Sequence, residues 1–373
     1  MIKVFPHPDI TPALTLFLEL NPKFEFVGNS DEADIIIINS HIYLHENSRK
    51  QLEEIVKPHH VLVNLEIFHI DHYMSIDWIR DCIHKPIVSN LTKKIITVHT
   101  NMNITDGYNT IFYDHLFDRQ KLYCTDYDSG IILSGRVWTH GCNKEIYSLN
   151  PIKKIPFKKF LAPMRVYKVS PNQQREPPRM EYRRKIKNFL SKTDDSFISA
   201  SNQSNSFLPN AATPDMIPYV SQGGSWYPIS DVYYSTSLIN VYTETLVVDE
   251  NNNNVRGVTE KSYDPLIKGN FILPFGYPGL IKDILSYGFK LPTWIDYSYD
   301  SILDNNKRFE AYMESLNTLN NYSLTELFDL AMQDWKILEH NRSIFYARTY
   351  SYPLLADKIK LCIEHNNSNN WMY

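Results

Sequence analysis

A dense group of cations lies in the run NQQREPPRMEYRRK, where a strand-to-helix loop is predicted to lead into a helix. The helix is expected to begin near Pro178, so Arg175 falls in the loop and Arg179 at the start of the helix. Helix N-terminal amides attract anions, and an arginine fork adds bidentate bonds, so this position predicts a diphosphate site. The alternative is a solvated basic helix face, to which Arg183 and Arg184 are expected to belong.

A second group combines Glu244 with the tripeptide Thr259, Glu260 and Lys261. A nucleotide sugar would be held by a carboxylate that accepts from the ribose hydroxyls and by a cation that offsets the diphosphate. Glu260 and Lys261 supply both at one predicted helix start, which Thr259 is placed to cap. The alternative is a capped surface helix that carries an ordinary charged pair.

Two groups have the residue types of a metal site. Asp126 and Asp128 form a D-x-D pattern, which also arises by chance in a chain of this length. His69, Asp71 and His72 resemble ligands, but without a distant third partner we interpret them as surface polar residues. The sequence therefore predicts no metal site.

The first hundred or so residues alternate short apolar runs with helical patterns, which is typical of a parallel sheet covered on both faces. Thr11 and Pro12 are expected to begin the first helix, ALTLFLEL. The expected strands are Ile2 to Phe5, Phe24 to Val27, Asp34 to Asn39, His60 to Glu66 and Lys94 to His99.

The basic, proline-punctuated run PIKKIPFKKFLAPMR is predicted to connect two domains. VYKVS, from Val166 to Ser170, is then expected to be the first strand of the second domain. We predict an N-terminal domain over residues 1–155 and a C-terminal domain over 156–345. A final helix over 346–373 could pack back on the first domain.

The second domain is expected to continue with two strands, SLINVYTETLVV and FILPFG, and with helices between and after them. A short helix should begin near Thr259, and Gly288 should end the helix that contains LIKDILS. An amphipathic helix is predicted over Phe309 to Leu319, followed by helical sequence from Leu324 to about Ile363.

Composition narrows the class of protein. The 373 residues are 43% hydrophobic and carry a net charge of −4, so bulk charge predicts no nucleic-acid partner. No apolar run reaches the roughly 18 residues that cross a bilayer, and no secretory leader is recognisable. The cysteines have no metal-binding or redox spacing, which favours reduced thiols and a soluble, cytoplasmic protein. They are Cys82, Cys124, Cys142 and Cys362.

The run VYTETLVVDENNNNVRGVTEKSYDPLIKGNFILPFG resembles the donor-binding segment of alpha-1,3-fucosyltransferases and of related viral or bacterial glycosyltransferases of the GT-B fold. Glu244 falls on their acidic residue at a strand end, and Glu260 and Lys261 fall on their T-E-K. The segment KVSPNQQREPPRMEYRRKI resembles their Val-Ser-Asn motif, which places Arg179 on the phosphate-binding arginine. A third stretch, PGLIKDILSYGFKLPTWIDYSYDSILDNNKRFEAY, is similar to the wider viral and bacterial group.

This resemblance covers roughly Val166 to Leu319 and departs from the family at two points. Pro171 replaces the expected asparagine, and Asp264 with Pro265 stands where a tryptophan-containing stretch is usual. A close match would imply GDP-fucose. The match to the group leaves GDP- and UDP-sugars open.

The resemblance implies an α/β protein with two Rossmann-like lobes of the GT-B type facing a central cleft, and a helical C-terminal tail. It implies a glycosyltransferase that moves a sugar from a nucleotide sugar to a hydroxyl of a glycan or glycoprotein acceptor, without a metal or other cofactor. The acceptor would contact the first lobe and the aromatic segment around Trp226 and Tyr227. The alternative is a non-catalytic carbohydrate-binding or scaffolding protein on a degenerate transferase fold.

An inverting transfer also needs a general base, which in this architecture comes from the first lobe. Ligands of parallel sheets gather at the carboxyl ends of strands, where Asn39, His41, Glu66 and His99 are expected. Glu66 is the first candidate, because a carboxylate that ends a buried strand has few structural reasons to be there. His99 is the second.

Overall fold

The described part of the chain forms an α/β fold with two all-parallel sheets. The protein is represented by a computed structural model that describes residues 1–10, 21–38, 46–66, 94–99, 110–113, 157–164, 178–193, 195–198, 231–244, 247, 256–349 and 352–369. The helix expected over ALTLFLEL lies outside these residues.

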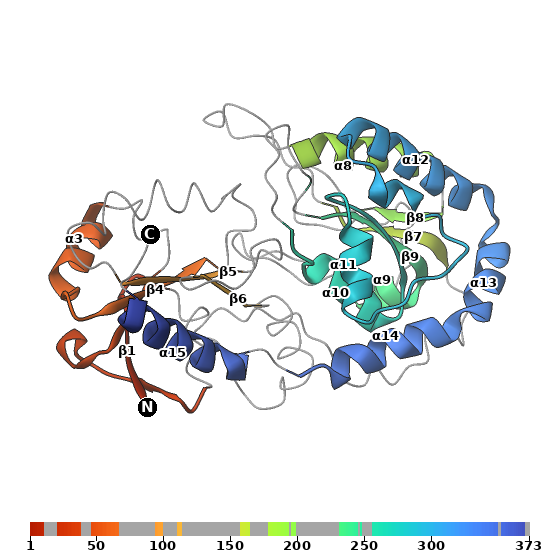
Figure 1. Ribbon diagram of the computed structural model, residues 1–373. Coiled ribbons are helices and arrows are strands. Elements are labelled where there is room, and N and C mark those ends of the chain that lie inside the picture. The colour runs from red at the N-terminus through yellow and green to blue at the C-terminus, as the bar shows by residue number, and fades with distance from the viewer. Residues whose placement is uncertain are drawn as a thin grey trace.

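The first sheet contains the strands that precede residue 113, in the order β2-β1-β3-β4-β5-β6 (Figure 1). Its strands are β1 (Ile2–Pro6), β2 (Phe24–Phe26), β3 (Ile35–Ile38), β4 (Val61–Glu66), β5 (Ile95–His99) and β6 (Thr110–Phe112). The expected strands are confirmed, and β6 is an addition. All side chains of β3 are buried, as a strand covered on both faces requires.

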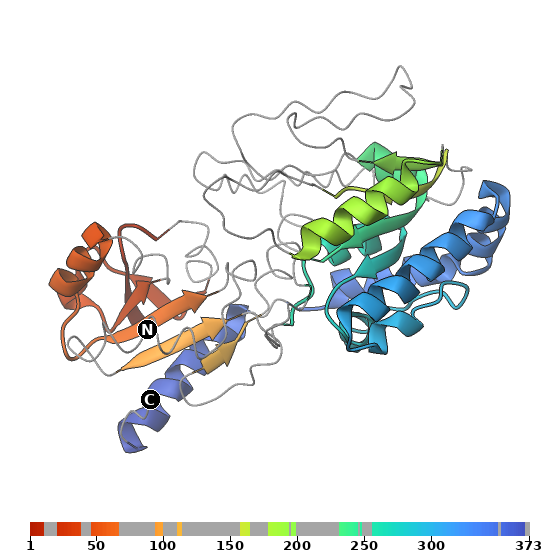
Figure 2. The ribbon, with the colours of Figure 1, turned by 90° about the horizontal axis from the view of Figure 1, so that it is seen from above.

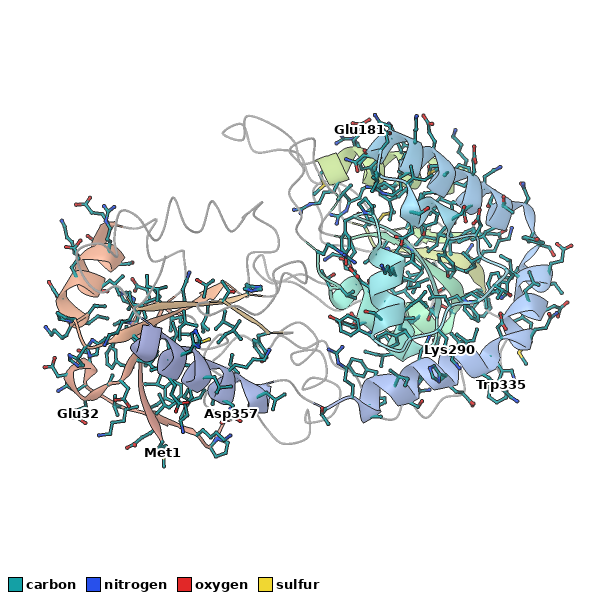
Figure 3. All side chains as sticks on the ribbon, in the orientation of Figure 1. Met1, Glu32, Glu181, Lys290, Trp335 and Asp357 are labelled. Atoms are coloured by element: carbon teal, nitrogen blue, oxygen red, sulfur yellow. The ribbon has the colours of Figure 1, made fainter. Side chains whose placement is uncertain are left out.

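Different helices cover the two faces of this sheet. The helix α3 (Glu46–Ile55) places Leu52 against one face, and the short η1 (Ser30–Glu32) precedes β3. The C-terminal helix α15 (Tyr352–Asn369) packs on the other face. It contributes Leu355, Ala356, Ile359 and Cys362 to the same apolar cluster as Val4 and Val63. Asp357, which Figure 3 labels, lies on α15. Its carboxylate forms an ion pair with Lys23, with an N to O distance of 2.6 Å.

The second sheet has the order β10-β9-β7-β8, again with all neighbours parallel. Figure 2 shows its strands, coloured from yellow-green to teal, apart from the orange strands of the first sheet. Its strands are β7 (Lys158–Ala162), β8 (Ser196–Ile198), β9 (Ser237–Thr243) and β10 (Phe271–Phe275). The helices are α8 (Pro178–Leu190), α9 (Asp231–Ser235), α10 (Glu260–Lys268), α11 (Leu280–Ser286), η6 (Ser298–Ser301), α12 (Asn305–Asn321), α13 (Leu324–Gln333) and α14 (Trp335–Ala347). Apolar residues of α8 and α12 pack on one face, and those of α10, α11 and α14 pack on the other.

The position of β7 corrects one sequence expectation. The basic segment predicted as a connection contains β7, which is an internal strand and precedes Val166 to Ser170, a stretch outside the described residues. Lys159 is the buried lysine of this strand, and it is tolerated because its charge has partners. Its Nζ lies 2.8 Å from an Asp195 carboxylate oxygen and donates to the Asn320 carbonyl at 3.1 Å. Its apolar neighbours are fully buried.

Local signals set the helix ends that matter for the site. Thr259 caps α10 as expected, and Gly269, with a φ of 82°, ends it. Gly288 follows α11 with a φ of 89°, as predicted from its place in the sequence. The described residues thus confirm an α/β fold with two parallel sheets. The GT-B arrangement and the domain limits stay predictions.

Candidate functional site

The strand order of the second sheet marks one place on its carboxyl edge. The chain passes from β7 outward to β8 and then returns across β7 to β9, so the direction of winding reverses between β7 and β9. Ligands of parallel α/β sheets bind at the carboxyl ends of strands beside such a reversal. The helices α8 and α10 follow these two strands along the chain.

Arg183 reaches this edge from α8. Its side chain is buried, and its Nε donates to Thr243 Oγ1 at 2.6 Å, at the last residue of β9. The expectation that Arg183 lies on a solvated helix face is therefore wrong, because its partner belongs to a distant strand. Arg179 is half-buried one turn earlier, on the same side of α8. Arg175 lies outside the described residues.

Glu244 directly follows β9, and its side chain is completely buried. Its Oε1 accepts from the Thr259 amide at 3.1 Å and from Ser262 Oγ at 2.8 Å. Its Oε2 accepts from Thr259 Oγ1 at 2.6 Å. The strand end and the start of α10 are therefore joined by one carboxylate.

The first turn of α10 carries the predicted Thr259, Glu260 and Lys261. The Thr259 hydroxyl accepts from the Lys261 amide at 3.3 Å, which closes the cap. Lys261 is half-buried, and only the backbone of Glu260 is described, as the first residue of the helix. The amides of residues 259, 261 and 262 already have acceptors, in Glu244 and in Thr259 itself. Lys261 is therefore the group of this turn that suits an anion.

Sequence reasoning missed two arginines near the neighbouring turn after β10. Arg308 is buried and donates through Nε to the Gly276 carbonyl at 3.1 Å, which fixes that turn. Arg256 forms a bidentate pair with Asp283, and its Nε to Oδ2 distance is 2.9 Å. A Cβ placed on Gly279, at the start of α11, would lie 3.5 Å from the Arg256 guanidinium. Neither arginine is conspicuous in the sequence, because Arg256 lies in a polar loop and Arg308 lies in the amphipathic helix α12.

The first sheet brings the two candidate bases to one edge. Glu66 and His99 are register partners at the carboxyl ends of β4 and β5. His99 is buried, and only the backbone of Glu66 is described. Neighbouring strands are about 4.8 Å apart, so the two backbone positions are adjacent. Asn39 and His41 lie outside the described residues.

His7 is a further buried histidine that sequence reasoning did not select. The Asp9 amide donates to its Nδ1 at 3.2 Å, so the other nitrogen carries the hydrogen and donates to the Ser48 carbonyl at 3.1 Å. Burial lowers the pKa of His7, which favours this neutral form. With both nitrogens engaged, His7 is a structural tie between β1 and α3.

Several residues singled out in the sequence lie outside the part of the chain that the structure describes. The D-x-D aspartates, His69, Asp71, His72, Trp226 and Tyr227 are outside the described residues. Within the described ranges, no group of three or more His, Cys, Asp or Glu is placed to hold a metal ion. Among the helices that can be described, none is both long enough and apolar enough to span a bilayer.

Fold and site together define a parallel α/β protein whose second sheet gathers helix N-termini and cations at one edge. No family model matches the sequence, and no curated protein matches it either. Among solved structures, the chain is similar to a crystal structure of an alpha1,3-fucosyltransferase with a TM-score of 0.41 and 11% identity. That likeness covers 94% of this chain and 92% of the other. None of these comparisons assigns the chain to a family.

Proposed function

We propose that this chain is a glycosyltransferase that moves a sugar from a nucleotide-sugar donor to a hydroxyl of a glycan acceptor. The observation that supports it is the carboxyl edge of the second sheet, beside the reversal between β7 and β9. There the start of α10 carries Lys261, and Glu244 anchors that start to the sheet. Such an edge suits the diphosphate of a nucleotide.

Each predicted residue has a role in this proposal. Lys261 and Arg179, with Arg175, offset the charge of the diphosphate, and Glu260 accepts from the ribose hydroxyls. When the sugar leaves, negative charge develops on the departing phosphate oxygen, where fixed cations are most effective. These groups supply the charge that a bound metal would supply, so we propose transfer without a metal.

The transfer itself requires one bond exchange and one proton acceptor. The bond between the sugar C1 and the phosphate oxygen breaks, a bond from C1 to the acceptor oxygen forms, and the nucleoside diphosphate leaves. The acceptor hydroxyl loses its proton to a general base, for which we propose Glu66 and, second, His99. The donor is a GDP- or UDP-sugar, since both share the diphosphate that the site would bind.

A thermal-shift panel tests the proposal. GDP, UDP and their sugars are added to the wild type, to Lys261→Ala and to a control, Lys336→Ala, whose lysine is exposed on α14. A nucleotide at a hundred times its Kd stabilises the folded state by about 2.7 kcal/mol. We expect this shift in the wild type and the control, and a much smaller one in Lys261→Ala.

The panel can also contradict the proposal. If no nucleotide or nucleotide sugar raises the melting temperature of the wild type, the transferase function is wrong. If nucleotide sugars bind but are not consumed with any glycan acceptor tried, the chain is a non-catalytic carbohydrate-binding protein instead. Release of free nucleoside diphosphate, measured by chromatography, separates these two results.

A further inference from the structure

We infer that Glu244 is a positioning residue of the donor site: its carboxylate holds the first turn of α10 in place and does not contact the donor. This inference rests on the proposed function of that turn, where Glu260 and Lys261 would meet the nucleotide. It changes the role expected of Glu244 from the sequence, in which the residue stands among the donor contacts.

The contacts of Glu244 leave little of its carboxylate for a ligand. Three donors, the amide and hydroxyl of Thr259 and the hydroxyl of Ser262, lie between 2.6 and 3.1 Å from its two oxygens. The side chain has no exposed surface. An ionised carboxylate accepts but never donates, so Glu244 fixes the hydroxyl hydrogens of both residues.

The effect of Glu244 passes to Lys261 through Thr259. Because the Thr259 hydroxyl hydrogen is directed at Glu244, its oxygen lone pairs are left for the Lys261 amide, 3.3 Å away. The carboxylate thus sets the geometry of the cap, and the cap sets the backbone that carries Glu260 and Lys261. Glu244 reaches the donor only through this turn.

A second residue of β9 supports the same turn. The Tyr242 hydroxyl donates to Ser262 Oγ at 2.7 Å, and Ser262 in turn donates to Glu244. Burial raises the pKa of Tyr242 well above its usual value, with the nearby charge of Glu244 as a smaller cause, so the hydroxyl keeps its proton. Tyr242 and Glu244 are two residues apart and lie on the same side of the strand.

The first turn of α10 is bonded to β9, an interior strand of the second sheet. β9 pairs with both β7 and β10, and the Glu244 amide donates to the Phe275 carbonyl at 2.7 Å. A binding turn tied to an interior strand is held more precisely than one on a free loop. The two ties from β9, Glu244 and the Tyr242–Ser262 pair, hold the first turn of α10 at both its cap and its third residue.

A double-mutant cycle tests this role through the affinity for GDP or UDP. Gln in place of Glu244 presents an amide N–H2 where an oxygen accepts a hydrogen bond, so the turn must shift. We expect Glu244→Gln to raise the nucleotide Kd roughly tenfold to a hundredfold. We expect the loss of affinity in the double variant with Lys261→Ala to be smaller than the product of the two single losses, because part of the effect of Glu244 passes through Lys261. If Glu244 touched the donor itself, the two losses would multiply.

Hydrogen exchange of the free protein gives a readout that needs no nucleotide. The amides of residues 259–262 should exchange faster in Glu244→Gln than in the wild type, and Ser262→Ala should show a smaller change in the same direction. Glu339→Gln, an exposed change on α14, is the matched control and should leave these amides unchanged. Unchanged exchange in Glu244→Gln would overturn the positioning role. Failure of the wild type to bind nucleotides would instead overturn only the proposed function.

Discussion

The charged residues near the carboxyl edge of the second sheet differ in what they contact. Arg183, Glu244 and Arg308 are buried, and each forms hydrogen bonds with the backbone or side chains of neighbouring elements. Arg179 and Lys261 are half-buried at the first turns of their helices. A buried charge is tolerated only with partners, so the first group builds the edge. The second group is better placed to meet a ligand.

Arg183 gives a direct test of this division. Arg183→Met keeps much of the side-chain volume but removes a charge-assisted bond to Thr243, so we expect it to lower the free energy of unfolding by about 2 kcal/mol. The control is Lys185→Met on the same helix, where an exposed i,i+4 pair with Glu181 is worth about 0.5 kcal/mol or less. Urea denaturation followed by circular dichroism measures both. Equal losses in the two variants would contradict a structural role for Arg183.

The general base is tested by a change that keeps shape. The amide of Glu66→Gln cannot take the proton from the acceptor's hydroxyl group. We therefore expect the rate of sugar transfer to fall by about a hundredfold or more while the nucleotide Kd stays unchanged. Turnover is measured as released nucleoside diphosphate. If Glu66→Gln retains full turnover and His99→Gln loses it, the base is His99, its register partner on β5.

Single residues were predictable from sequence where their partners are local. Thr259 is predictable as the cap of α10 because its hydroxyl and the Lys261 amide that donates to it are two residues apart. Arg183 was misplaced because its partner is sixty residues away, and helix periodicity alone cannot tell a buried arginine from a solvated one. The partners of Glu244, fifteen and eighteen residues away, were likewise not visible in a motif.

At the scale of elements, most strands can be predicted from their apolar runs, but β7 cannot. Its lysines and flanking prolines resemble a connection, and only Asp195 and the Asn320 carbonyl make Lys159 acceptable inside a sheet. Side chains from elsewhere in the chain also form hydrogen bonds with the edge strand β10. The Tyr297 and Tyr299 hydroxyls donate to the carbonyls of Ile272 and Pro274 at 2.8 and 2.7 Å. These bonds satisfy an edge that would otherwise be open to pairing.

The glycine that follows α11 allows a test of what ends this helix. Gly288 has a φ of 89°, a conformation that costs a residue with a Cβ roughly 1–2 kcal/mol. A Cβ there would lie 3.6 Å from the nearest side-chain atom, an ordinary contact, so the cost of Gly288→Ala is conformational. Gly28→Ala is the control, because a Cβ at Gly28 meets nothing within 4 Å. We expect a loss of about 1 kcal/mol in the first and less than about 0.5 in the second by urea denaturation. Equal stability of the two variants would contradict this reason for the glycine.

At the scale of the whole molecule, the two ends of the chain share one apolar cluster. The sequence indicated a C-terminal helix, but its packing depends on contacts such as Lys23 with Asp357, which are 334 residues apart. In the described residues α15 covers the face of the first sheet that carries Val4 and Val63. The stability of this sheet therefore depends on residues that lie far from its strands along the chain.

A single substitution in α15 tests that dependence. Ile359 is almost completely buried against the first sheet, so Ile359→Ala should cost about 2–5 kcal/mol through lost burial and the cavity it leaves. Leu361, two residues on, is 63% exposed, and Leu361→Ala should cost little. Hydrogen exchange read by mass spectrometry locates the effect. Faster exchange is expected in β1, β3 and β4 of Ile359→Ala, with β9 and β10 unchanged, because the cluster that contains Ile359 includes no residue of the second sheet. Equal acceleration in both sheets would show that α15 stabilises the molecule in some way other than through this cluster.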